Sequence, residues 1–132
     1  MKKNDRYNYV RVPRSDEEGN RTYDVGGSKL PSVTTILSRT KDQEHLKRWY
    51  ARKGFKEAER IKNHSGKRGT AMHKFLEAFI IGKGYEDLTP IGNEARTMAH
   101  KVIEEGLKPI EEYYGSEVTV YYPGLYAGST DL

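Results

Sequence analysis

The sequence contains no cysteine, one tryptophan and three phenylalanines among its 132 residues. The lack of cysteine excludes disulfides, a disulfide-linked partner and thiolate-bound metals, and it fits a reducing compartment. No apolar run approaches the roughly 20 residues that a membrane span requires, and the first ten residues lack the apolar core of a secretory signal. With 35% hydrophobic and 32% charged residues, the composition predicts one domain with a modest core and no membrane partner.

The charge that is present is unevenly distributed along the chain. Residues 39–68 hold eleven Lys or Arg against four Asp or Glu, whereas residues 86–117 hold three against eight. A basic segment beside an acidic one indicates one face that meets a polyanion and another that does not. A solvated helix surface explains the same charges, and this alternative stays open.

Hydrophobic periodicity predicts a mixed α/β chain. Residues 7–14 and 21–25 alternate apolar and polar side chains around the turn-like SDEEGN, which predicts a β-hairpin. SEVTVYY and LYAGSTDL predict two further strands around a Pro-Gly turn. We therefore divide the chain into an N-terminal hairpin (1–30), a helical region (31–114) and a C-terminal hairpin (115–132).

The helical region is expected to contain four segments. The first begins near Pro31, and the second covers residues 43–63 with a split at Gly54. HSGKRG is read as a break, after which helices cover residues 70–81 and 94–114, the last kinked at Pro109. The inward stripe of the second segment is expected to consist of Leu46, Trp49, Tyr50, Phe55, Ala58 and Ile61.

Two groups of residues are candidates for metal binding. His73 and Glu77 lie four residues apart on one face of a predicted helix, where an imidazole and a carboxylate can share a divalent cation. His100 and Glu104 have the same spacing, so an ordinary surface contact explains such a pair as well. Asp131 follows a predicted strand, where a carboxylate can project from a sheet edge and hold a hard cation.

The basic segment interleaves cations with aromatic side chains. Cations bind phosphates and aromatic rings stack on bases, a combination that suits single-stranded nucleic acid. The alternative assigns the aromatic rings to the core, and we expect it to hold for Trp49, which lies on the apolar stripe.

The order of these motifs resembles that of the PD-(D/E)XK nucleases of the RecB-like clan. LPSVTTIL, LKRWYARKG, RGTAMHKFLE and SEVTVYYPGLYAGSTDL follow one another over about residues 22–132. The order is similar to that of phage exonucleases of the mitochondrial genome maintenance exonuclease type. No single motif is specific, but GTxxH, a downstream SE strand and YAGSTDL together are fairly specific.

The resemblance implies a restriction-endonuclease-like core and a metal-dependent DNA exonuclease. By matching positions, it implies that His73 and Asp131 hold Mg²⁺ or Mn²⁺, with Glu117 and Glu77 as further acids of the site. It implies that the partner is DNA, either single-stranded or at duplex ends. It also implies a location in the cytoplasm, which would be the host cytoplasm if the protein is phage-encoded. The candidate contacts to the DNA backbone are Arg48, Arg52, Lys53, Lys67 and Arg68.

The sequence departs from this family after its last strand. The family continues into a strand with Asp or Glu, any residue, then Lys, and nothing follows Leu132. We therefore expect residues 1–132 to be the N-terminal part of a nuclease domain, inactive without the second acid and the lysine. Two other classes stay open: a non-catalytic nucleic-acid-binding module that needs no metal, and a helical protein-interaction domain.

Overall fold

The computed structural model describes all residues from 1 to 132, and the chain divides into two compact units. The helical unit consists of Met1–Lys2 and Asp42–Glu112, and the sheet unit consists of Lys3–Lys41 and Tyr113–Leu132. The predicted mixed α/β character is confirmed, since the chain holds four α-helices and three small sheets. The restriction-endonuclease-like arrangement stays a prediction. No helix is both long enough and apolar enough to cross a membrane.

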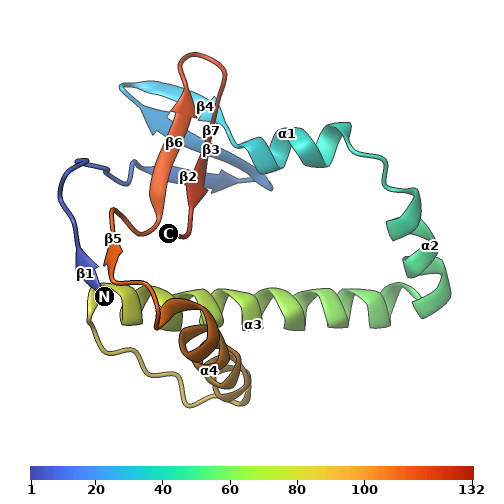
Figure 1. Ribbon diagram of the computed structural model, residues 1–132. Helices are drawn as coiled ribbons and strands as arrows, with labels where there is room; N and C mark the ends of the chain where they lie inside the picture. The colour runs from blue at the N-terminus through green and yellow to red at the C-terminus, as the bar shows by residue number, and fades with distance from the viewer. The chain divides into compact units, whose positions relative to one another are not determined.

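The sheet unit begins with a three-stranded antiparallel sheet, β2-β3-β4 (Figure 1). Its strands are β2 (Arg14–Glu17), β3 (Asn20–Val25) and β4 (Ser28–Pro31). Glu18 and Gly19 join the first two strands at φ 49° and 75°, the positive values that a tight two-residue hairpin turn requires. Arg21 Nε donates to Asp16 Oδ1 across the pair (2.8 Å), which lowers the pKa of Asp16.

The predicted hairpin of residues 7–14 with 21–25 is therefore wrong in its first strand. Only Arg14 of that range enters a strand, where it pairs with Tyr23. Residues 7–9 instead form a γ-turn, in which the Tyr9 N–H donates to the Tyr7 carbonyl over 2.9 Å. Pro13 has no N–H to donate, so the alternating pattern could not support a continuous ladder.

A short helix, α1 (Val33–Thr40), follows β4 directly. Ser32 is its N-cap, because the Ser32 hydroxyl accepts a hydrogen bond from the Thr34 N–H (3.2 Å). Ser32 is buried, with 2% of its surface exposed. The helix was expected to begin near Pro31, which lies in β4 instead. The sequence did not predict β4, which forms by pairing with β3.

The C-terminal hairpin is confirmed as β6 (Val118–Tyr122) and β7 (Tyr126–Thr130). Gly124 supplies the positive φ of its turn, 74°, and the Leu125 N–H donates to the Tyr122 carbonyl (3.1 Å). A parallel bridge joins Ala127 of β7 to Ser32. Ala127 is fully buried there with Tyr23 and Leu30, so the hairpin and the three-stranded sheet share one core.

The helical unit contains α2 (Glu44–Lys53) and α3 (Phe55–Ile81). The split at Gly54 is confirmed, with φ of 85°. The predicted break at residues 64–69 is wrong, because α3 runs through all 27 residues to Gly82, which caps it at φ 72°. Two interior glycines cost only about 1 kcal/mol each, which flanking helix and packed neighbours outweigh. The inward stripe is also partly wrong, since Leu46 is exposed and Phe55 is 74% exposed, whereas Ala58 is fully buried.

The next helix, α4 (Pro90–Val102), packs along the C-terminal half of α3 (Figure 1). It begins earlier than predicted because Thr89 caps it, accepting from the Gly92 N–H (3.0 Å). A π-helical turn, η1 (Ile103–Leu107), follows, so the expected helix over 94–114 ends before Pro109. Two-residue strands β1 (Lys2–Lys3) and β5 (Glu112–Tyr113) complete the structure.

Candidate metal centre

Glu117 and Asp131 lie opposite one another at the open end of the β6–β7 hairpin. Val118 pairs with Thr130, so the residue before β6 and the residue after β7 fall side by side. The Glu117 N–H donates to the Asp131 carbonyl (3.1 Å), and Ser116 Oγ donates to the same oxygen (3.3 Å). A carboxylate oxygen of each residue lies within 4.8 Å of the other. The hairpin register therefore brings two acids together that are fourteen positions apart in the sequence.

The backbone at Glu117 is held in the left-handed region, at φ 55°. This conformation costs an L-residue with a long side chain about 1 kcal/mol or more, and glycine or asparagine would adopt it more readily. Glu117 is half-buried, and Arg11 Nη2 lies 3.8 Å from its Oε2. Strained backbone conformations cluster at functional sites, so this geometry is consistent with a role for the Glu117 carboxylate.

A pocket of about 310 Å³ opens beside Glu117 in the sheet unit. Arg11, Arg14, Thr119 and Ser129 contribute its polar lining. Two guanidinium groups and two hydroxyls beside a carboxylate suit an anion with several acceptor oxygens, such as a phosphate group. Neither arginine was predicted to bind a ligand, because their segment was predicted to be a β-strand.

His73 and Glu77 belong to the helical unit, where both lie on α3. His73 is exposed and Glu77, one turn later, is half-buried. The structure thus brings Glu117 and Asp131 together within the sheet unit. The participation of His73 and Glu77 in the same site stays a prediction.

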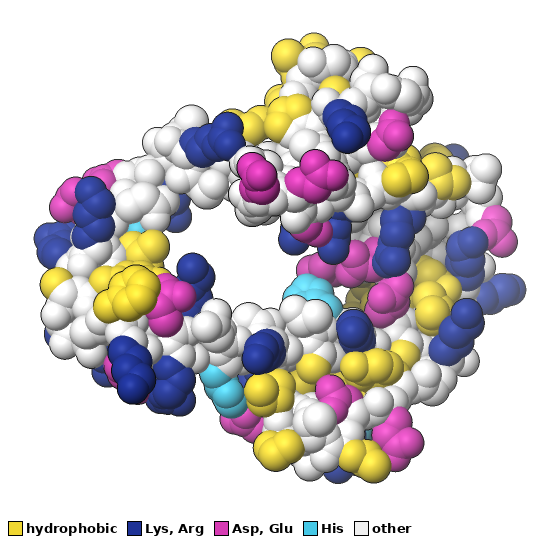
Figure 2. All heavy atoms as spheres, turned by 180° about the vertical axis from the view of Figure 1, so that it is seen from behind, with side chains coloured by type: hydrophobic (Ala, Val, Ile, Leu, Met, Phe, Trp, Pro, Cys, Tyr) yellow, Lys and Arg dark blue, Asp and Glu magenta, His cyan; other side chains and the backbone are white.

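The predicted DNA contacts are exposed cations of α2 and α3, with one exception. Figure 2 shows Lys and Arg side chains, in dark blue, over α2 and the adjoining part of α3. Arg48, Arg52 and Lys53 are exposed on α2, and Lys67 is exposed on α3. Arg68 is the exception, because it is half-buried and its Nη1 lies 3.6 Å from Glu94 Oε1.

Lys67 also lines a groove of about 590 Å³ along α3. Lys62 and Lys74 line the same groove, together with Tyr85 and Asp87 from the segment that follows α3. Lys67 and Lys74, seven residues apart, lie on the same side of a continuous helix, whereas Lys62 lies about a third of a turn away from them. This continuous surface was not expected, because a helix break was predicted at residues 64–69.

The aromatic rings of α2 contact one another, and Tyr50 also lies 6.1 Å from the Phe55 ring of α3, between centroids. Trp49 and Tyr50 meet edge to face with centroids 5.3 Å apart, and Trp49 is half-buried, in line with its expected structural role. Tyr50 Oη donates to Glu59 Oε1 (2.6 Å), and this hydrogen bond raises the pKa of Tyr50. Tyr50 therefore links α2 to α3.

Comparison of the chain with models of protein families, with curated proteins and with solved structures finds no match.

Proposed function

We propose that this chain belongs to a divalent-metal-dependent DNA exonuclease in which Asp131, Glu117 and His73 hold the metal ion. The single observation that supports the proposal most is the pair of carboxylates, within 4.8 Å, that the β6–β7 register brings together. The order of sequence motifs that resembles the PD-(D/E)XK nucleases implies His73 and Asp131 as metal ligands and Glu117 as a further acid of the site.

The donor set fits a hard divalent cation. Two negative charges at 4.8 Å repel by about 1 kcal/mol in bulk water and by several times more where solvent is partly excluded, so a cation between them is favoured. Oxygen ligands suit Mg²⁺, and an added imidazole favours Mn²⁺ as the alternative. Glu117 and Asp131 would hold the ion between them after small side-chain rotations, since their carboxylate oxygens already lie within 4.8 Å.

A bound divalent ion would lower the charge on the phosphate and activate a water for attack on the phosphodiester. The residues of the chain would position the substrate. Arg11 and Arg14 would hold phosphate oxygens beside the carboxylates, because both line the pocket next to Glu117. Arg48, Arg52, Lys53 and Lys67 would bind the DNA backbone further from the reacting phosphate. Glu77 remains a candidate for a further acid of the site.

The test is nuclease activity of the natural protein that carries this chain, with Asp131→Asn as the variant. We expect loss of a direct ligand to lower activity in Mg²⁺ or Mn²⁺ by more than the roughly 10- to 100-fold that outer-shell partners cost. The affinity for DNA in EDTA should be unchanged, because the variant removes a metal ligand and leaves every Lys and Arg side chain in place. Glu17→Gln, an exposed acid of β2, is the control. Full activity of Asp131→Asn would remove this carboxylate from the site.

The second candidate is a nucleic-acid-binding module without catalysis. It is favoured by the groove of α3, whose lining holds three lysines against the single acid Asp87. Such a module would bind DNA with strong salt dependence and without any effect of EDTA. Metal-dependent cleavage that is lost in Asp131→Asn would exclude it as the whole function.

A further inference from the structure

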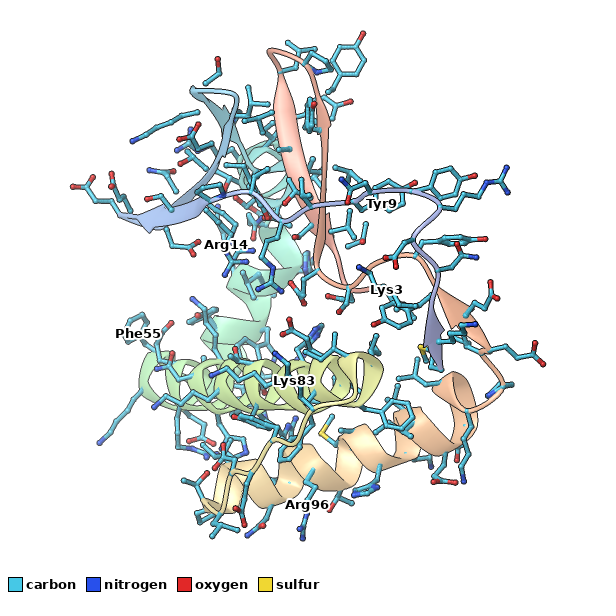
Figure 3. All side chains as sticks on the ribbon, turned by 90° about the vertical axis from the view of Figure 1, so that its left-hand side faces the viewer. Lys3, Tyr9, Arg14, Phe55, Lys83 and Arg96 are labelled. Atoms are coloured by element: carbon cyan, nitrogen blue, oxygen red, sulfur yellow. The ribbon has the colours of Figure 1, made fainter.

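The segment from Lys3 to Arg14 is rich in cations and tyrosines and is mostly without regular structure. It holds four Lys or Arg against one acid, and that acid, Asp5, pairs with Lys3 (2.9 Å). Figure 3 shows Tyr9 on this extended segment, with Lys3 towards one end and Arg14 at the other. None of the roles proposed above uses the first part of this segment.

Three tyrosines of the sheet unit form a cluster here. The Tyr7 ring lies 5.6 Å from the Tyr9 ring and 5.3 Å from the Tyr114 ring, between centroids. The guanidinium carbon of Arg6 lies 5.4 Å from the centroid of Tyr7, in the range of a cation–π contact. As whole residues, Tyr7, Tyr9 and Tyr114 are 44%, 51% and 43% exposed, so each of them meets solvent.

Hydrogen bonds on both sides hold this cluster against residues 113–119. The Asn4 N–H donates to the Tyr113 carbonyl (2.8 Å), and the Val12 N–H donates to Thr119 Oγ1 (3.2 Å). Gly115 allows its chain to pack against Val118, because a Cβ there would clash with Val118 Cγ2, and Tyr9 Cβ lies within ordinary contact distance of the same position, at 3.6 Å. The rings are therefore presented from a fixed backbone, which lowers the entropy cost of binding a ligand.

We propose that Tyr7, Tyr9 and Tyr114 form a stacking platform for unpaired bases, and that Arg6 and Arg11 bind the adjacent phosphates of a single strand. Exposed aromatic rings interleaved with cations are the combination that single-stranded nucleic acid requires. A duplex hides the faces of its bases in the helical stack, so it could use the cations but not the rings. The excess of positive charge favours a polyanion over an apolar protein surface.

The platform continues towards the carboxylate pair. Arg11 follows Tyr9 by two residues and lies 3.8 Å from Glu117, and it lines the pocket beside that acid. A strand stacked on the tyrosines would thus pass its phosphates to Arg11 and the candidate metal centre. This inference rests on the proposed function only in taking nucleic acid as the ligand, and it specifies a single strand as the form bound there.

The test is the affinity for a labelled oligothymidylate of about 15 nucleotides, measured by fluorescence anisotropy in EDTA. The variants are Tyr7→Ser and Tyr9→Ser, and Tyr7→Phe and Tyr9→Phe are the conservative versions that keep a ring. We expect each Ser variant to weaken single-strand binding at least about fivefold and each Phe variant to bind like the wild type. Binding to a hairpin duplex should change by less than about twofold.

Tyr121→Ser and Tyr122→Ser are the matched controls, since both tyrosines are more than half exposed on β6 of the same unit. Thermal melts establish that every variant folds, and Tyr7→Ser decides the outcome if Tyr9→Ser is unstable. Equal losses in platform and control variants, equal losses for single strand and duplex, or no binding at all would overturn the proposal. The proposal would also be overturned if a Tyr7 or Tyr9 variant changed the self-association of the protein but not its affinity for the single strand. Because EDTA removes the metal, these results do not depend on whether the Glu117–Asp131 pair binds an ion.

Discussion

Replacement of Gly66 by alanine tests whether α3 is one continuous helix. The helix has 27 residues, or about 40 Å at 1.5 Å per residue, and Gly66 and Gly69 lie in its interior. A Cβ built on either glycine meets nothing within 4 Å, so alanine adds no clash. Alanine is favoured over glycine in a helix interior by about 0.5–1 kcal/mol, and no burial term opposes this gain.

We therefore expect Gly66→Ala to raise the free energy of unfolding by about 0.5–1 kcal/mol, or roughly 2–5 °C in Tm. Urea denaturation followed by far-UV circular dichroism measures both the stability and the added helicity. Gly19→Ala is the matched control, because that Cβ also has open space but the backbone has φ of 75°. It should lower stability by about 1 kcal/mol. A Gly66→Ala variant that loses stability, as Gly19→Ala should, would refute the continuous helix.

Two further predictions concern single acids. Glu117→Asn should leave the free energy of unfolding unchanged or raise it by up to about 1 kcal/mol, because asparagine tolerates the left-handed backbone at φ 55°. Urea denaturation measures this difference. A clear loss of stability would show that the contact of Glu117 with Arg11 matters more than the backbone strain. Asp87 accepts from the Thr89 hydroxyl (2.6 Å) and N–H (3.1 Å), and these bonds lower its pKa below the usual 3.8. The Asp87 carboxylate therefore stabilises the fold above pH 3.8, and this contribution is lost as the pH falls through the lower pKa of the folded state. Asp87→Asn should accordingly make the free energy of unfolding fall less steeply with acidification below about pH 4. An unchanged pH dependence in this variant would contradict the assignment.

The strongest sequence signals were local and periodic. Val118 and Val120 alternate with polar residues before Pro123 and Gly124, and the hairpin formed where this pattern placed it. The adjacency of Glu117 and Asp131 follows from that register alone. The split at Gly54 was predicted correctly for the same reason, since this glycine ends a helix at a positive φ.

The errors arose where neighbours in space outweigh local preference. HSGKRG resembles a break, yet His64 and Arg68 both contact Glu94 of α4, at 3.0 and 3.6 Å. These contacts and the apolar seam between α3 and α4 stabilise a helix that the local sequence favours only weakly. The β2 strand was misplaced because Glu18 adopts a positive φ that its residue type does not announce.

The tyrosine platform and the pocket arginines could not be found by periodicity. Tyr114 comes from a different part of the chain than Tyr7 and Tyr9, and the segment that carries the latter two is irregular. The sequence shows only that the segment from Lys3 to Arg14 holds four Lys or Arg against one acid. Such a composition does not specify which aromatic rings contact one another.

The central claim is that an ion held by Glu117 and Asp131 is also bound by His73, and a paramagnetic titration tests it most directly. The chain has four histidines, so His45, His64 and His100 serve as internal controls in the same spectrum. When Mn²⁺ is added in small amounts, the imidazole signals of His73 should broaden first, and Asp131→Asn should remove that preference. Equal broadening of all four histidines, or an unchanged pattern in Asp131→Asn, would contradict the shared site.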